Sequence, residues 1–133
     1  MDDKLIPGIV LGVFFLIVLL LQLIPRLAAR HMKGQRAPAL DAVLGGRQKG
    51  QARLLLYFWS PSCGMCKNMT PVINELMALR DDVVSIDISQ HLDLARAFGV
   101  MGTPALAIIE QGIVREVSLG VKSRARIVKM LED

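Results

Sequence analysis

Two cysteines, Cys63 and Cys66, are the residues whose type and spacing point most directly to chemistry. They form one Cys-x-x-Cys motif, and the 133-residue sequence contains no other cysteine. Two thiols three residues apart can close a small disulfide, open it again, and exchange it with a disulfide of another molecule. The motif follows the apolar run 53–59 and precedes a segment with helical spacing of apolar residues, which is the context typical of a redox motif.

A position at the start of a helix predicts different roles for the two thiols. Unpaired backbone N–H groups and the positive end of the helix dipole stabilise a thiolate on the first cysteine. We therefore expect Cys63 to attack a disulfide and Cys66, one turn further along, to resolve the mixed disulfide. Lys67 adds positive charge beside the pair.

Other uses of two cysteines remain alternatives. A purely structural disulfide closes a very small loop here and contributes little stability. A zinc site needs four ligands in most proteins, and the histidines His31 and His91 show no spacing that would complete one. We predict no metal site, but copper(I) favours thiolates. A copper-handling binding module or a scaffold without turnover is therefore the alternative to redox catalysis.

The elements that must position the cysteines alternate between strands and helices. In chain order, the sequence first predicts a strand over 53–59, a helix after Cys63 that is kinked at Pro71, and a strand over 83–88. A helix over 90–98 follows, capped by Ser89 and stopped by Gly99. Strands over 105–110 and 113–119 are joined at Gln111-Gly112, and a last helix is capped by Ser123. The first crossover requires parallel strands and the hairpin adds antiparallel ones. This order predicts an α/β fold with one central mixed sheet flanked by helices.

The N-terminal part of the sequence is of a different kind. Residues 5–24 contain no charge and one strongly polar side chain, Gln22. Twenty residues of helix rise about 30 Å, which matches the hydrocarbon core of a bilayer. We therefore predict a transmembrane anchor over 1–25 that ends at Pro25, a basic juxtamembrane linker over 26–36, and a domain over 37–133. Residues 5–24 would contact membrane lipid.

A cleaved signal peptide is the alternative to an anchor. Its apolar region is usually about 7–15 residues long and follows a positively charged segment. Here the apolar run is longer and Asp2 and Asp3 make the preceding segment acidic. The small residues Ala28 and Ala29 are the best cleavage candidate, but arginines flank them. We expect the anchor to stay uncleaved.

The distribution of charge bears on partners and on orientation. The net charge of +4 arises from four basic residues that follow the apolar run without any acid, Arg26, Arg30, Lys33 and Arg36, whereas the domain is nearly balanced. The domain therefore lacks the excess of positive charge that a nucleic-acid-binding protein needs. Positive flanks stay on the cytoplasmic side of a first helix. We expect a cytoplasmic domain, with the extracytoplasmic (periplasmic) side as the alternative.

The residues around the cysteines resemble a known family. The segment from Phe58 to Lys67, FWSPSCGMCK, is similar to the active-site segment of thioredoxin-like proteins, and Gly102-Thr103-Pro104 is similar to the cis-proline loop of that family. Pro71, Gly112 and Gly120 also fall where the family has a proline or a glycine. The resemblance covers roughly residues 37–133, and the preceding helix makes the whole similar to a membrane-anchored thioredoxin-domain protein.

The resemblance implies a thioredoxin-like fold and thiol–disulfide oxidoreductase activity on protein thiols and disulfides. It implies no organic cofactor, and it leaves the electron donor unidentified. The residues that it implies as support for the cysteines are Trp59, Gly64, Met65, Lys67, Thr103 and Pro104. We expect the Thr103–Pro104 peptide bond to be cis, because X–Pro bonds adopt this form at low cost, and to face the cysteine pair.

Two positions depart from the family pattern. Many thioredoxins have a buried Asp in the first core strand that assists deprotonation of the resolving thiol, and Tyr57 stands at that position. We expect Tyr57 to be a core aromatic with a satisfied hydroxyl, so that solvent takes the proton from Cys66. The common Gly-Pro between the cysteines is Gly64-Met65 here. Proline preorganises a first helical turn and methionine does not, so the redox potential is expected to differ.

Overall fold

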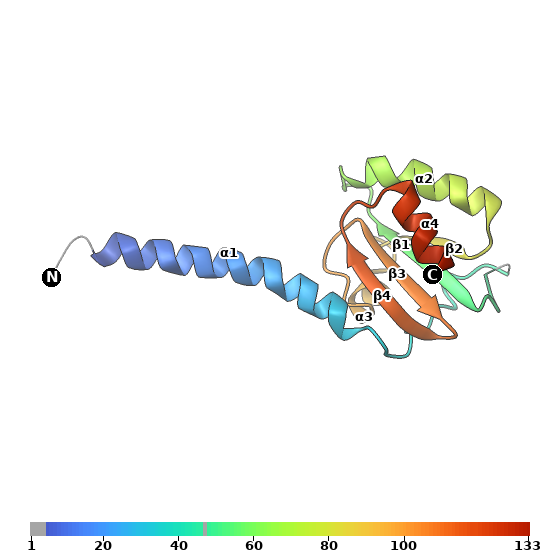
Figure 1. Ribbon diagram of the computed structural model, residues 1–133, viewed down its shortest axis with the longest axis horizontal. Coiled ribbons are helices and arrows are strands. Elements are labelled where there is room, and N and C mark those ends of the chain that lie inside the picture. Colours follow the sequence, from blue (N-terminus) through green and yellow to red (C-terminus); the bar gives the residue numbers. More distant parts are fainter. Residues whose placement is uncertain (1–4, 47) are drawn as a thin grey trace.

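The computed structural model describes residues 5–46 and 48–133, which form a long N-terminal helix that extends away from a small α/β domain (Figure 1). The elements are α1 (Leu5–His31), β1 (Arg53–Trp59), α2 (Cys66–Leu79), β2 (Val83–Asp87), α3 (Leu92–Ala97), β3 (Ala105–Glu110), β4 (Ile113–Leu119) and α4 (Arg124–Glu132). This is the order of strands and helices that the sequence predicts.

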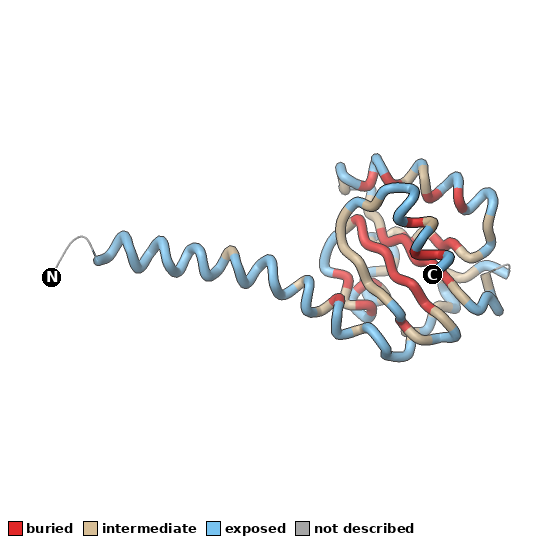
Figure 2. The backbone as a smooth tube through the Cα atoms, in the orientation of Figure 1, coloured by how far each residue is buried: buried red, intermediate tan, exposed pale blue. Residues whose placement is uncertain are grey.

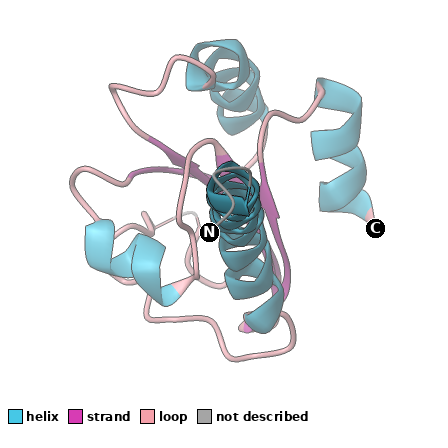
Figure 3. Cartoon of the chain, turned by 90° about the vertical axis from the view of Figure 1, so that its left-hand side faces the viewer, coloured by secondary structure: helices cyan, strands magenta, loops and turns pink. Residues whose placement is uncertain are grey.

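One four-stranded sheet organises the domain, with the strand order β2-β1-β3-β4. Strand β1 pairs parallel with β2 and antiparallel with β3, and β3 pairs antiparallel with β4. The predicted mixed sheet is therefore confirmed. Helices α2 and α4 lie on one side of the sheet and α3 on the other (Figure 3). Covered on both faces, β1 buries five consecutive residues, which explains its continuous apolar sequence.

Two apolar cores fill the two sides of the sheet, and Figure 2 shows the buried residues gathered there. Under α2 and α4 lie alternate residues of β1, including Leu55 and Tyr57. On the opposite side, Phe58 packs against Phe98, which follows α3, with ring centroids 5.5 Å apart. Because β1 ends at Trp59, these contacts fix the place where the strand leads into the cysteine motif.

The predicted hairpin turn and the predicted cap of the last helix are both confirmed. Gln111 and Gly112 both have positive φ, 50° and 77°, as a two-residue hairpin turn requires. The Ser123 hydroxyl accepts a hydrogen bond of 3.3 Å from the Arg126 N–H and caps α4. The predicted cap at Ser89 is wrong. The Asp87 carboxylate accepts hydrogen bonds from both the N–H and the hydroxyl of Ser89, and α3 begins only at Leu92.

Helix α1 is longer than predicted, because it continues through Pro25 to His31. A proline removes one backbone hydrogen bond, and the Arg, Leu and Ala residues that follow it favour helix. The last turns also pack on the domain, where Ala29 is 4% exposed. In the described part of the chain, α1 alone has the length and apolarity to cross a membrane, with a mean hydropathy of 2.7 over 18 residues and none of that window buried.

The segment after α1 pairs with β4. The Gly34 N–H donates to the Val114 carbonyl at 2.7 Å, the Val114 N–H donates to the Gln35 carbonyl at 2.8 Å, and the Ala37 N–H donates to the Gly112 carbonyl at 2.8 Å. The predicted linker over 26–36 is thus held to the domain, first as helix and then as extended chain.

A pH-dependent contribution to stability is expected from an ion pair before β2. Arg80 donates two hydrogen bonds to the Asp82 carboxylate, at 2.8 and 2.7 Å, and they lower the pKa of Asp82 below its usual value. A lowered folded-state pKa stabilises the fold above the unfolded-state pKa, and this contribution is lost as the pH falls through the folded-state pKa. Since solvent partly screens the pair, Asp82→Asn should reduce the free energy of unfolding at pH 7 by about 1 kcal/mol.

Urea unfolding at pH 7 and below pH 4 measures this effect. The difference between wild type and Asp82→Asn should shrink at the lower pH. Arg80→Gln should cost about as much as Asp82→Asn, and the double variant little more, because both changes remove the same interaction. A loss that is independent of pH would contradict the assignment.

Candidate active site

The cysteine pair lies between the end of β1 and the first turn of α2. Cys63 and Cys66 form a disulfide with a Cα–Cα distance of 5.3 Å. Cys66 is the first residue of α2, and Cys63 lies in the preceding turn rather than in the helix itself. Cys66 is 2% exposed whereas Cys63 is half-buried. An attacking molecule therefore reaches the sulfur of Cys63 more easily than that of Cys66.

Backbone dipoles at the start of α2 point at Cys63. The Cys66 N–H donates to Cys63 Sγ at 3.2 Å. This donor is one of the N–H groups that a helix leaves unpaired at its N-terminus, where the helix dipole is positive. When the disulfide is open, the same N–H stabilises negative charge on Cys63 Sγ and so favours its thiolate form.

A groove of about 400 Å³ runs past the cysteines. Its lining residues come from the end of β1, from the turn that follows and from one face of α2: Trp59, Ser60, Pro61, Cys63, Cys66, Lys67, Thr70, Pro71 and Asn74. The structure thus brings the predicted site residues Trp59 and Lys67 to the cysteines. Thr70 and Asn74 were missed, although their spacing of four and eight residues from Cys66 places them on the same helix face.

The residues Gly64, Met65, Thr103 and Pro104 do not line this groove. Gly64 and Met65 form the turn between the cysteines, and Met65 is exposed. The Thr103–Pro104 peptide bond is cis, as predicted. Pro104 is buried, and its carbonyl accepts a hydrogen bond of 2.9 Å from the Gly120 N–H. That this bond faces the cysteines stays a prediction.

Tyr57 is a buried core residue with a satisfied hydroxyl, which confirms the interpretation from the sequence. Its Oη lies 3.0 Å from Thr70 Oγ1 and donates to the Cys66 carbonyl at 3.4 Å. Burial raises the pKa of Tyr57, although the bond to Thr70 opposes this effect. The phenol therefore stays protonated at neutral pH and cannot act as a base. No carboxylate is among the residues that line the groove. That solvent takes the proton of the Cys66 thiol stays a prediction.

Removal of the Tyr57 hydroxyl tests this division of roles. Tyr57→Phe should keep the rate of disulfide exchange within about twofold, because the hydroxyl anchors α2 rather than moving a proton. The free energy of unfolding should fall by about 1 kcal/mol through the lost hydrogen bonds. Urea unfolding and reduction of a soluble disulfide measure the two quantities. A rate loss above about tenfold with the fold intact would assign Tyr57 a chemical role.

The described residues offer no further ligands that would complete a metal site at the cysteine pair. Within 5–46 and 48–133, no three His, Cys, Asp or Glu side chains gather closely enough to hold a metal ion. His31 ends α1 and His91 precedes α3, and neither lines the groove beside the cysteines.

A disulfide at a helix N-terminus, with one sulfur accessible from a groove and the other buried, is suited to dithiol–disulfide exchange. Together with a mixed sheet covered by helices, it defines the class of the thiol–disulfide oxidoreductases. The sequence matches the thioredoxin family over residues 47–133, and the chain belongs to this family. It is therefore a thiol–disulfide oxidoreductase of the thioredoxin family, as the sequence predicts.

Individual relatives agree in sequence and in structure. The chain is 35% identical to thioredoxin from Bacillus subtilis over 81 residues, which cover 59% of this chain and 78% of that protein. A variant thioredoxin from Halobacterium salinarum superimposes with a TM-score of 0.60 at 27% identity, covering 68% of this chain and 85% of that one. Mitochondrial thioredoxin 3 from Saccharomyces cerevisiae gives a TM-score of 0.56 at 25% identity, covering 64% of this chain and 81% of that one.

Proposed function

We propose that this protein is a membrane-anchored oxidoreductase that reduces disulfides of protein substrates through Cys63 and Cys66. The Cys63 thiolate attacks one sulfur of a substrate disulfide and releases the other sulfur as a thiolate. The Cys66 thiol loses its proton to solvent and attacks Cys63 Sγ, which releases the second substrate thiolate. The substrate gains two electrons and two protons, and the Cys63–Cys66 disulfide forms. A dithiol donor then reverses these steps on the enzyme.

The observation that carries this proposal is the contrast between the two sulfurs. The Cys66 N–H donates to Cys63 Sγ. Both cysteines border the groove, but Cys63 is half-buried whereas Cys66 is almost fully buried. An accessible, stabilised thiolate is suited to attack a large substrate. A buried neighbour three residues away is suited to resolve the product, because it reaches only the sulfur of Cys63.

The supporting residues have roles that follow from their places. Trp59 and Lys67 border the groove, so they would contact the substrate and place positive charge near the thiolate. Gly64 and Met65 form the turn that sets the spacing of the sulfurs. Thr103 and Pro104 would offer backbone groups to an extended substrate segment. The proline itself has no N–H to donate.

The membrane part of the proposal rests on α1. Its apolar, exposed surface is as long as a bilayer core, which supports a single spanning segment over 5–24 in contact with lipid. Division into an anchor (1–25), a juxtamembrane segment (26–36) and a catalytic domain (37–133) follows. Cleavage near Ala29 would remove helical turns that pack on the domain, so an uncleaved anchor fits the fold better. The basic flank favours a cytoplasmic domain.

Reduction of insulin disulfides by the full chain in detergent micelles, with dithiothreitol as the dithiol donor, tests the catalytic proposal. We expect catalysis well above the rate of dithiothreitol alone. A copper(I) titration of the same preparation addresses the binding-module alternative. Tight copper binding without acceleration of insulin reduction would overturn the proposed activity in favour of that alternative.

Fusions to the C-terminus test the orientation. A fluorescent protein that folds in the cytoplasm should be active, and an alkaline phosphatase that needs export should be inactive. Neutral replacement of the four basic residues that follow residue 24 should weaken or invert this pattern, because they set the orientation. An active phosphatase fusion on the wild-type chain would place the domain outside the cytoplasm.

A further inference from the structure

The end of α1 is fixed to the catalytic domain on two sides. One face of the last turns of α1 lies beside Arg96, Ala97 and Gly99 at the end of α3. A second face of the same turns lies beside residues 116–119 of β4. Gly99 has a φ of 67°, and a Cβ on it would lie 2.7 Å from the Ala28 carbonyl oxygen. This close approach therefore requires glycine. With the backbone pairing of residues 34–37 to β4, these contacts make α1 and the domain one body.

The strand register shows at which end of the sheet α1 leaves the domain. The chain runs antiparallel to β4, because Arg26 and Ala29 lie beside residues 116–119 and Ala37 bonds to Gly112. At the end of β4, Leu119 pairs with Ala105, and Ala105 pairs with Phe58 of β1. This is the end at which β1 leads into the cysteine turn. The redox site and the anchor therefore share one end of the sheet.

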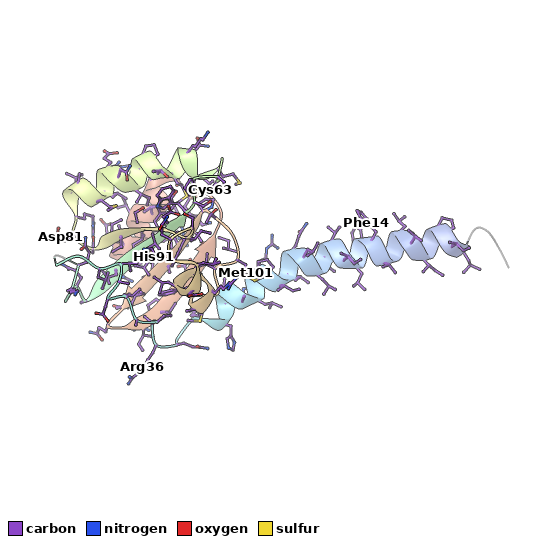
Figure 4. The ribbon with its side chains drawn as sticks, turned by 180° about the vertical axis from the view of Figure 1, so that it is seen from behind. Phe14, Arg36, Cys63, Asp81, His91 and Met101 are labelled. Atoms are coloured by element: carbon purple, nitrogen blue, oxygen red, sulfur yellow. A yellow bond between two sulfur atoms is a disulfide. The ribbon has the colours of Figure 1, made fainter. Side chains whose placement is uncertain are left out.

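The views of the whole molecule agree with this register. In Figure 1 the loop before α2 lies on the side of the domain from which α1 departs. Figure 4 places Cys63 and Met101 on that side and Asp81 on the opposite one. A membrane crossed by α1 would therefore face the cysteine pair.

The distance to that membrane is short. The uncharged run ends at Ile24 and α1 ends at His31, so the helix rises only about 10 Å between them. The headgroup layer is itself about 5–8 Å thick on each side of the hydrocarbon core. The end of the domain that carries the cysteines would therefore lie next to the headgroups.

Exposed apolar side chains gather in the loops at this end of the sheet. Met65 lies between the cysteines and is 57% exposed. Met101, three residues before Pro104, is 60% exposed, and Val121 beside Gly120 is 43% exposed. The Gly120 N–H bonds to the Pro104 carbonyl, which joins two of these loops. Such a rim suits an apolar partner surface better than a strongly charged one.

We propose that the disulfide exchanged at this site belongs to an integral membrane protein and lies at the membrane–water interface. The inference rests on the proposed function and names its partner class. The partner disulfide takes two electrons and two protons from the Cys63–Cys66 dithiol by the exchange steps given above. A folded soluble protein of 100 residues has a radius of gyration of about 13 Å, so it does not fit between the domain and the bilayer.

Fluorescence quenching measures the depth of the site. The Cys66→Ser full chain, labelled at Cys63 with a small fluorophore, is reconstituted in phosphatidylcholine vesicles that contain headgroup-labelled nitroxide lipid. The control carries the fluorophore on Gln111→Cys in a chain without Cys63 and Cys66, at the opposite end of the sheet. We expect strong quenching at position 63 and little at 111. Equal quenching at the two positions would overturn the proposed orientation.

Two synthetic single-span peptides test the partner class. One carries its disulfide about three residues beyond the span, and the other carries it about 25 residues beyond, on a flexible Gly-Ser segment. In the same vesicles, with dithiothreitol as donor, the full chain should reduce the near disulfide about tenfold faster than the far one, because its effective concentration at the site is higher. Equal rates would overturn the inference.

A matched variant separates the effect of orientation from that of chemistry. An insertion of about ten Gly and Ser residues after Ile24 frees the domain from the span, yet it keeps the docked turns and the cysteines unchanged. The preference for the near disulfide should fall to about that of an unoriented domain, with insulin reduction at least as fast as in the wild type. Failure of the wild type to reduce insulin would instead contradict the proposed function itself. Insulin reduction without a preference between the peptides would contradict only the present inference.

Discussion

Cys63→Ser should lower the rate of insulin reduction by more than about a thousandfold, because a serine hydroxyl does not form the nucleophilic anion at neutral pH. Cys66→Ser should also lose turnover, but for a different reason. The exposed Cys63 Sγ still attacks, and the product stays attached as a mixed disulfide because the buried resolving thiol is missing. The two variants should therefore look alike in a steady-state assay and differ in a single turnover.

The single turnover is measured with an aromatic disulfide reagent that releases a coloured thiol. Cys66→Ser should release one equivalent and retain the other half of the reagent, as mass spectrometry would show. Cys63→Ser should react much more slowly, since Cys66 is 2% exposed. Leu79→Ala, an exposed change at the far end of α2, is the control and should behave as wild type. Faster capture by Cys63→Ser than by Cys66→Ser would reverse the assigned roles.

Phe98→Ala should be the most destabilising change outside the site, with a loss of about 3–5 kcal/mol in the free energy of unfolding. Phe98 is fully buried, and its ring packs against Phe58 at the end of β1. It also precedes Gly99, which the Ala28 carbonyl of α1 approaches so closely that a Cβ would not fit there. The loss is a large share of the roughly 5–15 kcal/mol that stabilises a domain.

Denaturant unfolding of the full chain in micelles measures the loss. Leu79→Ala is again the matched control, because it removes a 73% exposed apolar side chain and should change stability by less than about 0.5 kcal/mol. Protease sensitivity after residue 24 should rise in Phe98→Ala, since the α3 end that receives α1 is loosened. A loss below about 1 kcal/mol would show that the ring pair does not hold these elements together.

Local chemistry explains which parts of the structure the sequence predicted. The positive φ values at Gln111 and Gly112 and the cap at Ser123 each depend on neighbouring residues. The cis bond before Pro104 was expected from the resemblance of its loop to that of the family. The role of Tyr57 followed from a buried strand, where a hydroxyl must find a partner. These features require no knowledge of distant parts of the chain.

Long-range packing explains what the sequence did not predict. Pro25 normally favours the end of a helix, but α1 continues because its last turns meet β4 and the end of α3. The failed cap at Ser89 has instead a local cause, the competition from the Asp87 carboxylate two residues earlier. The groove residues Thr70 and Asn74 share a helix face with Cys66, but that face becomes a groove wall only because the end of β1 and the turn after it lie beside α2.

The uninterrupted course of α1 into its docked turns makes the protein sensitive to helical phase. Each helical residue turns the chain by about 100°, so one residue inserted near Val18 would rotate the domain by that angle relative to the first half of the helix. About seven inserted residues, close to two full turns, would nearly restore the original direction. A domain on a flexible tether has no such dependence. If another transmembrane helix binds one side of the apolar part of α1, the choice of that side also fixes the direction, in the plane of the membrane, in which Cys63 points.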